Sequence, residues 1–376
     1  MDYGASVLPN PSSIHGVGVE AKRKLEKNRK DVADILSCSP KEIIFTSGGT
    51  ESNNLAIQGV IFGGWTPKMH IVTTNIEHPS VLETIKLLKK RKLADITIID
   101  VEQDGLVDPK KILDAIKKNT ILVSVMYANN EIGTIQPIKE IAKGIRFYRK
   151  NNNTKFPLFH TDGVQAVNYL DINLERLGVD LLSISGTKIE SAGRVGVLYK
   201  KRTVNLAPIW GGGDQEMGLR PGTENLLEIV KFSSAFQKME KEKEKEKNRL
   251  YKLQNYFLSR LSKNIKNNWI LNGDKENRLP NNINITFANI PSDLMVLELS
   301  ARGIMTSPQS ACHSSHRDGS YVIKAIHKDI DGEVGGVRFS FGKSTKKEDI
   351  DYTIKTIKDI LKKLKKWYPV VDFGNN

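Results

Sequence analysis

Several residues that could do chemistry follow short apolar segments of the sequence. Gly48 and Gly49 stand between the apolar stretch Glu42 to Thr46 and a segment of helical spacing. Glycines there let the backbone approach an anion, and free amides at a helix start point toward it. A strand-to-helix turn with two glycines is structural as often as it is functional. The pair therefore marks a candidate anion site that needs partners from elsewhere in the chain.

Asp162 and Lys188 are the most informative candidate partners. Asp162 follows an apolar run, where a carboxylate is costly unless something cationic or hydrogen bonding meets it. The protonated ring nitrogen of pyridoxal 5'-phosphate would meet it, and that charge makes the ring an electron sink. Lys188 ends the segment Ser183 to Lys188 and could form a Schiff base, although alone it is one of many lysines. His78 follows a further apolar run and, taken alone, is more readily explained by packing than by chemistry, unless it faces a cofactor.

The segments around these residues alternate between short apolar runs rich in Ile and Val, which are typical of strands, and longer segments with apolar residues at helical spacing. This alternation predicts an α/β fold, a mainly parallel sheet sandwiched by helices, in which strand ends gather ligands at one edge. Residues 10–230 are predicted to form this large domain, and residues 231–376 a smaller α+β domain that residues 1–9 could join. The predicted strands are Glu42 to Thr46, His70 to Thr74, Ile96 to Val101, Thr120 to Ala128, Pro157 to His160, Leu181 to Ile184 and Val195 to Tyr199, and the predicted helices between them are Pro79 to Lys92, Pro109 to Lys118 and Ile138 to Lys150.

Charge and cysteine content narrow the class of protein. Much of the net charge of +14 lies in residues 238–266 and 343–366, and within residues 238–247 Lys and Glu alternate, so that opposite charges face one another at helical spacing. This pattern favours a solvated helix over a nucleic-acid surface. Cys38 and Cys312 are the only cysteines, too few for a disulfide framework, and no apolar run reaches the ~18 residues that span a bilayer. We expect a cytoplasmic protein without a metal site.

Five segments in order resemble the signatures of one family. The chain from about residue 10 to 351 resembles the cysteine desulfurases, pyridoxal-phosphate enzymes of aminotransferase class V with the fold type I architecture. The similarity also implies a homodimer. The segments that carry it are Asn10 to Gly16, Glu77 to Pro79, Asn129 to Gly133, Arg220 to Asn225 and Ser310 to Cys312.

The resemblance implies a role for each candidate residue. Lys188, His78 and Cys312 would be catalytic, and Asn130 and Arg338 would bind substrate. Thr223 would reach the cofactor phosphate of the neighbouring subunit. The implied cofactor-binding residues are Gly49, Thr50, His78, Asn130, Asp162, Gln165, Ser185, Thr187, Lys188 and Thr223.

The implied reaction converts L-cysteine to L-alanine. Sulfur would pass to Cys312 as a persulfide and then to an acceptor or scaffold protein, for iron-sulfur cluster or other thio-cofactor assembly. A persulfide requires a thiolate, and the polar residues after Cys312 suit an exposed loop.

Three positions depart from the family's usual residues. Thr187 stands where a histidine is usual, and Asp214 and Gln309 stand where glycines are usual. Two alternatives therefore remain beside the desulfurase. One is a catalytically impaired relative that serves in binding or assembly, and the other is a related lyase or aminotransferase acting on another amino acid.

Overall fold

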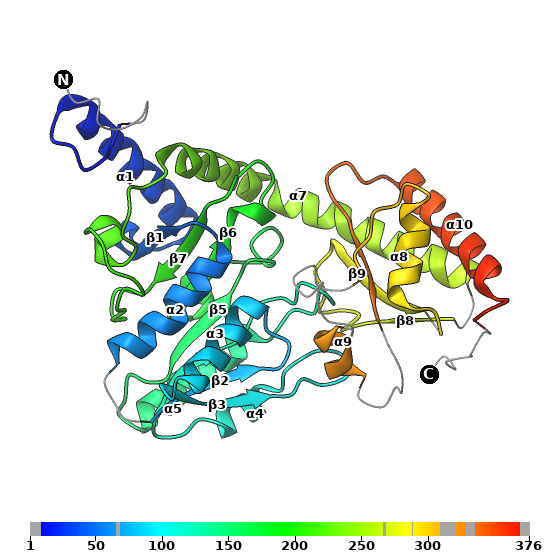
Figure 1. Cartoon of the computed structure of the whole chain (residues 1–376), viewed down its shortest axis with the longest axis horizontal. Helices are drawn as coiled ribbons and strands as arrows, with labels where there is room; N and C mark the ends of the chain where they lie inside the picture. Colours follow the sequence, from blue (N-terminus) through cyan, green and yellow to red (C-terminus); the bar gives the residue numbers. More distant parts are fainter. Residues whose placement is uncertain are drawn as a thin grey trace. The chain divides into compact units, whose positions relative to one another are not determined.

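The computed structural model describes residues 9–64, 68–265, 268–287, 289–308, 320–327 and 335–368. The chain divides into two compact units (Figure 1). The division predicted at residue 230 falls inside helix α7, Leu226–Asn264, which begins in the first unit and ends in the second. The first unit contains Met1–Ile99, Pro109–Tyr127 and Pro137–Lys243, and the second contains Asp100–Asp108, Ala128–Gln136 and Glu244–Asn376.

The first unit is built on a seven-stranded sheet in the order β1-β7-β6-β5-β4-β2-β3. Strand β7 runs antiparallel to both of its neighbours, and the other neighbouring pairs are parallel. Every residue of β1, β2, β4, β5 and β6 is buried, as expected for strands covered on both faces. The strands are β1 Ile43–Thr46, β2 Met69–Thr74, β3 Ala94–Ile99, β4 Thr120–Ser124, β5 Leu158–Asp162, β6 Leu181–Ser185 and β7 Gly196–Lys200.

Helix α2, Gly49–Gly63, is the central helix of this unit and packs on strands β4, β5, β6 and β7 and on helix α3 (Figure 1). Its Leu55, Ala56 and Val60 are buried in one apolar cluster with Ile71 and Leu122 of the sheet. The start of α2 is thereby fixed against the middle of the sheet. The other elements are α1 Gly16–Leu36, α3 Pro79–Lys90, α4 Pro109–Asp114, α5 Ile138–Asn151, α6 Leu174–Leu177 and the 3₁₀ turns η1 Pro40–Glu42, η2 Gly186–Lys188 and η3 Gln215–Gly218.

The strand predicted over Thr120 to Ala128 ends at Ser124. The amide of Met126 donates to Glu77 Oε1 at 2.9 Å, instead of to a neighbouring strand. A buried side-chain acceptor has replaced the ladder bond there. The sequence periodicity cannot register this substitution, because residues beyond Ser124 stay apolar and buried.

The second unit contains a three-stranded antiparallel sheet in the order β10-β9-β8. The ring of Phe257, on α7, lies 5.1 Å from Phe339 and 5.9 Å from Phe341, centroid to centroid. A parallel-sheet unit followed by this α+β unit confirms the predicted fold class. The elements are β8 Trp269–Leu271, β9 Asn282–Phe287, β10 Val337–Ser340, α8 Ser292–Ser300, α9 Tyr321–Ile326 and α10 Lys347–Leu364. Within the described part of the chain, no helix is long and apolar enough to cross a membrane.

Candidate active site

Asp162 and Lys188 lie at the ends of neighbouring parallel strands. Asp162 is the last residue of β5 and pairs with Ser183 of β6, whose chain continues through Ser185 into the turn that ends at Lys188. The Lys188 side chain is exposed, and its carbonyl accepts a hydrogen bond from Asn168. The structure therefore brings the two residues to the same edge of the sheet, where ligands of such sheets gather.

Asp162 is a buried carboxylate that receives hydrogen bonds but has no cation beside it. It is 5 % exposed and accepts from Asn53 Nδ2 at 2.7 Å and from the Val164 amide at 3.0 Å. Among the described residues, no lysine, arginine or histidine forms an ion pair with it. A buried carboxylate is costly without such a partner. A protonated pyridine nitrogen would supply the missing charge, so this residue fits the cofactor.

The turn at the start of α2 lies against the ends of β5 and β6. A Cβ atom on Gly49 would come within 2.8 Å of Val164 Cγ2 and 3.3 Å of Ser185 Cβ, so only glycine fits this close approach. Thr50 follows and is exposed. The hydroxyl oxygens of Ser185 and Thr187 lie 2.9 Å apart. Hydroxyls beside a helix start suit a phosphate group, so this corner fits the cofactor as well.

His78 begins helix α3 and is half-buried. Its Nδ1 accepts the Ser80 amide at 3.1 Å and lies 2.8 Å from Ser80 Oγ. Ser80 Oγ in turn accepts from Asn53 Nδ2 at 2.8 Å, the same nitrogen that donates to Asp162. Sequence reasoning missed Asn53 and Ser80. Asn53 lies four residues after Gly49, one helical turn along the same face of α2, and this spacing was the available signal.

Gln165 lies three residues after Asp162 and is half-buried. It belongs to the turn whose Val164 amide donates to Asp162. Its position is therefore adjacent to the end of strand β5. Its predicted role toward the ring hydroxyl stays a prediction.

Thr223 lies on an exposed loop of the first unit. Arg220, three residues before it, donates from Nε to Glu51 Oε1 at 2.9 Å, and Glu51 directly follows Thr50. The loop is thus tied to the turn at the start of α2. The Thr223 side chain is exposed in the single chain, and its predicted role toward the phosphate of a neighbouring subunit stays a prediction.

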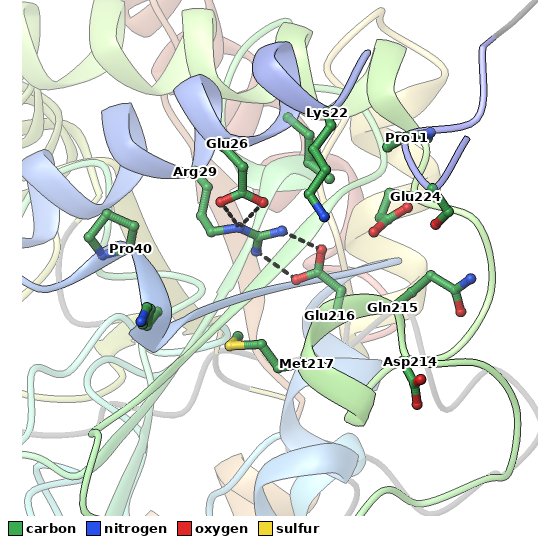
Figure 2. A pocket seen from close by; sticks show the side chains of 13 residues that line it. Pro11, Lys22, Glu26, Arg29, Pro40, Asp214, Gln215, Glu216, Met217 and Glu224 are labelled. Atoms are coloured by element: carbon green, nitrogen blue, oxygen red, sulfur yellow. Dashed lines mark hydrogen bonds and ion pairs between the residues drawn. The ribbon is translucent and has the colours of Figure 1, made fainter. Parts of the chain in front are cut away.

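A cavity of about 830 Å³ lies between α1 and this loop (Figure 2). At its centre, both terminal guanidinium nitrogens of Arg29 donate to Glu216 at 2.7 Å, and the Phe45 amide donates to the same carboxylate at 2.8 Å. Glu216 and Met217 have φ values of 48° and 61°, in the left-handed region. Asp214, one of the unusual residues of the sequence, lines this cavity. Its mixed charges and the absence of strand-end residues from its lining separate it from the candidate site.

The second unit brings Asn130 and Arg338 together, although 208 positions separate them. Arg338 Nη1 donates to the Asn130 carbonyl at 2.8 Å, and Nη2 donates to Ser307 Oγ at 3.2 Å. Arg338 Nε and Asn130 Oδ1 are buried and have no hydrogen-bond partner among the described residues. Burial lowers the pKa of Arg338, and the charge of Glu131 opposes that shift. These open donors and acceptors fit an amino acid, whose carboxylate needs donors and whose amine needs an acceptor.

Cys312 and Gln309 lie outside the described residues, so the role predicted for Cys312 stays a prediction. Cys38 is described and is half-buried. Burial, with the nearby Glu42 and Asp34 carboxylates, raises the pKa of its thiol to about 12. A thiol with so high a pKa is a poor nucleophile at neutral pH. The described residues hold no group of three or more His, Cys, Asp or Glu side chains that could bind a metal.

The residues at this sheet edge can be compared with those of known proteins. The aminotransferase class-V family matches residues 2–353. The chain belongs to this family. Pyridoxal 5'-phosphate is the cofactor of these enzymes, and the predicted family and cofactor are thereby confirmed.

Relatives within the class-V family include named desulfurases. The chain is 42% identical to cysteine desulfurase IscS of Dictyoglomus turgidum, over 95% of this chain and 88% of that protein. A solved NifS-like protein superposes with a TM-score of 0.85 at 34% identity, covering 94% of this chain and 92% of the other. A structure of SspA in complex with cysteine superposes with a TM-score of 0.73 at 30% identity, covering 88% and 90%.

Proposed function

We propose that this chain is a pyridoxal-phosphate-dependent cysteine desulfurase. The observation that carries the proposal is the buried Asp162, without a cation beside it, at the end of the strand next to the one that leads to Lys188. The relatives named as cysteine desulfurases, and the structural neighbour described as SspA in complex with cysteine, support the choice of L-cysteine as substrate.

The first unit would hold the cofactor. Gly49, Thr50, Ser185 and Thr187 would bind its phosphate, and Asp162 its ring nitrogen. When bound to Lys188, pyridoxal phosphate supplies an electron sink for the charge left on the substrate Cα. Gln165 would donate to the ring hydroxyl, and His78 would cover the ring face and hold an exchangeable proton.

The second unit would orient the substrate. The guanidinium of Arg338 would bind its carboxylate in a two-point contact, with Asn130 beside it. The Lys188 amine, once released, would take the Cα proton. The Cys312 thiolate would then attack the substrate sulfur, forming the S–S bond of a persulfide as the C–S bond breaks, and the carbon fragment would leave as L-alanine after taking up a proton.

A homodimer is part of the proposal. Thr223 is exposed on its own subunit, and Trp210, Met217 and Leu227 near it are exposed apolar side chains, 47%, 50% and 52% accessible. We propose that these side chains form part of the surface that a second copy covers, since contiguous apolar surface is typical of interaction sites. A second copy covering this loop would place Thr223 at the neighbouring phosphate. Mixing a Lys188→Ala chain with a Thr223→Val chain should restore activity in the mixed dimer, which neither parent dimer has in full.

The persulfide would pass to an acceptor or scaffold protein in the cytoplasm. Only two cysteines occur in the chain, which suits a reducing compartment where a persulfide is handed on by thiol exchange. An acceptor thiol protein should therefore become labelled when the enzyme is supplied with ³⁵S-cysteine.

The absorbance spectrum and the products together test the proposal. The purified protein with added cofactor should show a visible band, lost in Lys188→Ala, and should form alanine and sulfide from cysteine with a thiol reductant. Cys312→Ala should keep the band and lose persulfide formation, whereas the matched control Cys38→Ala should keep both. A protein that takes up no cofactor would instead be a binding or assembly protein. Alanine formation that is independent of Cys312 would indicate a related lyase or aminotransferase.

A further inference from the structure

Four side chains of the first unit form one continuous chain of hydrogen bonds. His78 and Ser80 come from the start of α3, Asn53 from α2, and Asp162 from the end of β5. The links are 2.8 Å from His78 Nδ1 to Ser80 Oγ, 2.8 Å from Asn53 Nδ2 to Ser80 Oγ and 2.7 Å from Asn53 Nδ2 to Asp162 Oδ2. His78 and Asp162 are the two ends, and both have roles in the proposed function.

The direction of each bond at His78 follows from the backbone. The amide of Ser80 can only donate, and it points at His78 Nδ1 from 3.1 Å. Nδ1 must therefore carry a lone pair and no hydrogen. The Ser80 hydroxyl, 2.8 Å from the same nitrogen, must then donate to it as well. Since the hydroxyl has one hydrogen, its oxygen is left to accept from Asn53.

The orientation of Asn53 follows from the charge on Asp162. The two hydrogens of the Asn53 amide are both donated, one to Ser80 Oγ and one to Asp162 Oδ2. Asn53 is 1% exposed, and its Oδ1 has no hydrogen-bond donor among the described residues. Turning the amide over would place Oδ1 against a carboxylate and lose both donated bonds. The hydrogen bond to Asp162 therefore fixes the orientation of the amide, and this orientation leaves the amide oxygen without a donor.

We infer that Asn53 and Ser80 are positioning residues that couple, through one amide group, the position of the Asp162 carboxyl group to the tautomer of His78. Both Asp162 oxygens accept hydrogen bonds, one from Asn53 Nδ2 and one from the Val164 amide. His78 is held as the neutral tautomer with its hydrogen on Nε2, so Nε2 is the one ring atom that can give up a proton. This inference rests on the proposed function for what the two ends do, but the network itself is a property of the protein without ligand.

The tautomer can be measured directly in the cofactor-free protein. The chain has seven histidines, and the ¹⁵N signals of His78 in ring-labelled protein can be assigned by their loss in His78→Gln. We expect a pyridine-type Nδ1 and a pyrrole-type Nε2. A hydrogen on Nδ1 would overturn the inference, and this result needs no enzymatic activity.

The coupling can be measured with a matched pair of variants. Asn53→Asp presents acceptors where the amide presented donors, so the Ser80 hydroxyl should turn from His78 toward the new carboxyl, which must share a proton with Asp162. The ¹⁵N shift of His78 Nδ1 should move, and cofactor affinity should fall by about tenfold or more. Asn54→Asp adds the same charge at the next residue, whose side chain bonds to Thr50, Gln58 and Thr84. It should change neither the ¹⁵N shift of His78 Nδ1 nor the cofactor affinity.

A second pair of variants separates positioning from packing. Ser80→Ala should shift the His78 Nδ1 signal, and Ser80→Thr, which keeps the hydroxyl, should restore it. Thr84→Val removes a different hydroxyl of α3 and should leave the signal in place. Unchanged His78 signals and cofactor affinity in both Asn53→Asp and Ser80→Ala would sink the inference. Because these signals are read without turnover, they stay informative even if the protein proves not to be a desulfurase.

Discussion

The two candidate binding regions differ in how completely their polar groups are satisfied. At the strand ends of the first unit, both Asp162 oxygens and His78 Nδ1 receive hydrogen bonds from the chain itself, although Asn53 Oδ1 beside them has no donor among the described residues. In the second unit, Arg338 Nε and Asn130 Oδ1 are buried without a partner among the described residues. Buried polar groups are normally paired, so the second region has hydrogen-bonding groups that a ligand could satisfy.

This difference suits the two ligands of the proposed function, a cofactor that stays bound and a substrate that binds and leaves in each turnover. A cofactor that stays needs neighbours fixed in one charge state, and a pre-satisfied network supplies that. A substrate that comes and goes gains most of its affinity by satisfying groups that are left open, since each open group makes the empty site less stable. The same chain thus uses saturation at one region and incompleteness at the other.

The largest effect is expected from a substitution in the saturated region, the hydrogen-bonded strand ends around Asp162. Asp162→Asn replaces the carboxylate with an amide, so Asn53 would face a second donor and the ring nitrogen would lose its counter-charge. Loss of one preorganised electrostatic contact costs about 10²- to 10³-fold in rate, and we expect kcat to fall toward the upper end of that range. Steady-state alanine formation measures it.

Asp171→Asn serves as the control, because Asp171 is a partly exposed carboxylate of the same unit that already faces Arg176 at 3.2 Å. It should leave kcat within about twofold, as expected for an exposed ion pair. Equal losses in the two variants would mean that the unit responds to any lost charge, and the contrast drawn for Asp162 would fail.

The next effect tests the open region. Arg338→Leu removes the two-point donor for a substrate carboxylate, and charge-assisted bonds of this kind contribute about 1.5–3 kcal/mol. We expect KM for cysteine to rise by about 100-fold while cofactor affinity stays unchanged. Arg338→Lys, which keeps the charge without the planar fork, should lie between the two.

Arg302→Leu is the matched control for Arg338, since Arg302 lies at the end of α8 and pairs with Glu298 instead of presenting open donors. It should leave KM unaltered. A fall in cofactor affinity in Arg338→Leu, with KM unaltered, would reverse the roles assigned to the two regions.

The sequence predicted the saturated region better than the open one. Lys188, Asp162 and Ser185 could be placed together because each ends or follows a buried strand, and parallel strands end at one edge. Asn130 and Arg338 lie 208 positions apart, and only the family resemblance paired them. No local periodicity can report a contact made between distant segments.

The residues that sequence reasoning missed are polar groups inside buried elements. Asn53 and Ser80 are 1% and 8% exposed, yet asparagine and serine near a helix start are typical of solvent-facing or capping positions. The unit division was also beyond reach, since residues 100–108 and 128–136 join the second unit through contacts far along the chain. Cys312 and the homodimer stay predictions.

A smaller effect concerns the pH dependence of stability that comes from Glu77, a buried carboxyl group near Asp162. Glu77 is fully buried, and burial raises its pKa to about 8 from 4.5, with the nearby Asp162 charge adding to the shift. Folded protein therefore keeps a proton that the unfolded chain loses as pH rises. Stability from this group is complete below about pH 4.5 and is lost as the pH climbs to about 8. The loss is about 1.4 kcal/mol per pH unit within that window.

Glu77→Gln should remove this slope, because glutamine stays neutral and keeps an oxygen for the Thr74 hydroxyl and the Met126 amide. Denaturant unfolding at several pH values between 5 and 8 measures it. Glu83→Gln, on the exposed face of α3, should leave the slope as it is in the original protein. An identical slope in Glu77→Gln would mean that Glu77 is ionised when folded, and that the strand-end region holds two charged carboxylates.

The smallest effect concerns Thr187, where the family usually has histidine. Its hydroxyl lies 2.9 Å from Ser185 Oγ, and its side chain is exposed, so in the proposed site it would be a minor ligand of the phosphate. One such bond contributes about 1 kcal/mol net, and Thr187→Val should weaken cofactor affinity only about fivefold, measured by titration of the absorbance band. Thr187→Ser should match the original protein. A loss beyond about 50-fold in Thr187→Val would show that the hydroxyl binds phosphate as a principal ligand. A small loss would mean that the start of α2 and Ser185 already saturate the phosphate, as the contrast between the two regions requires.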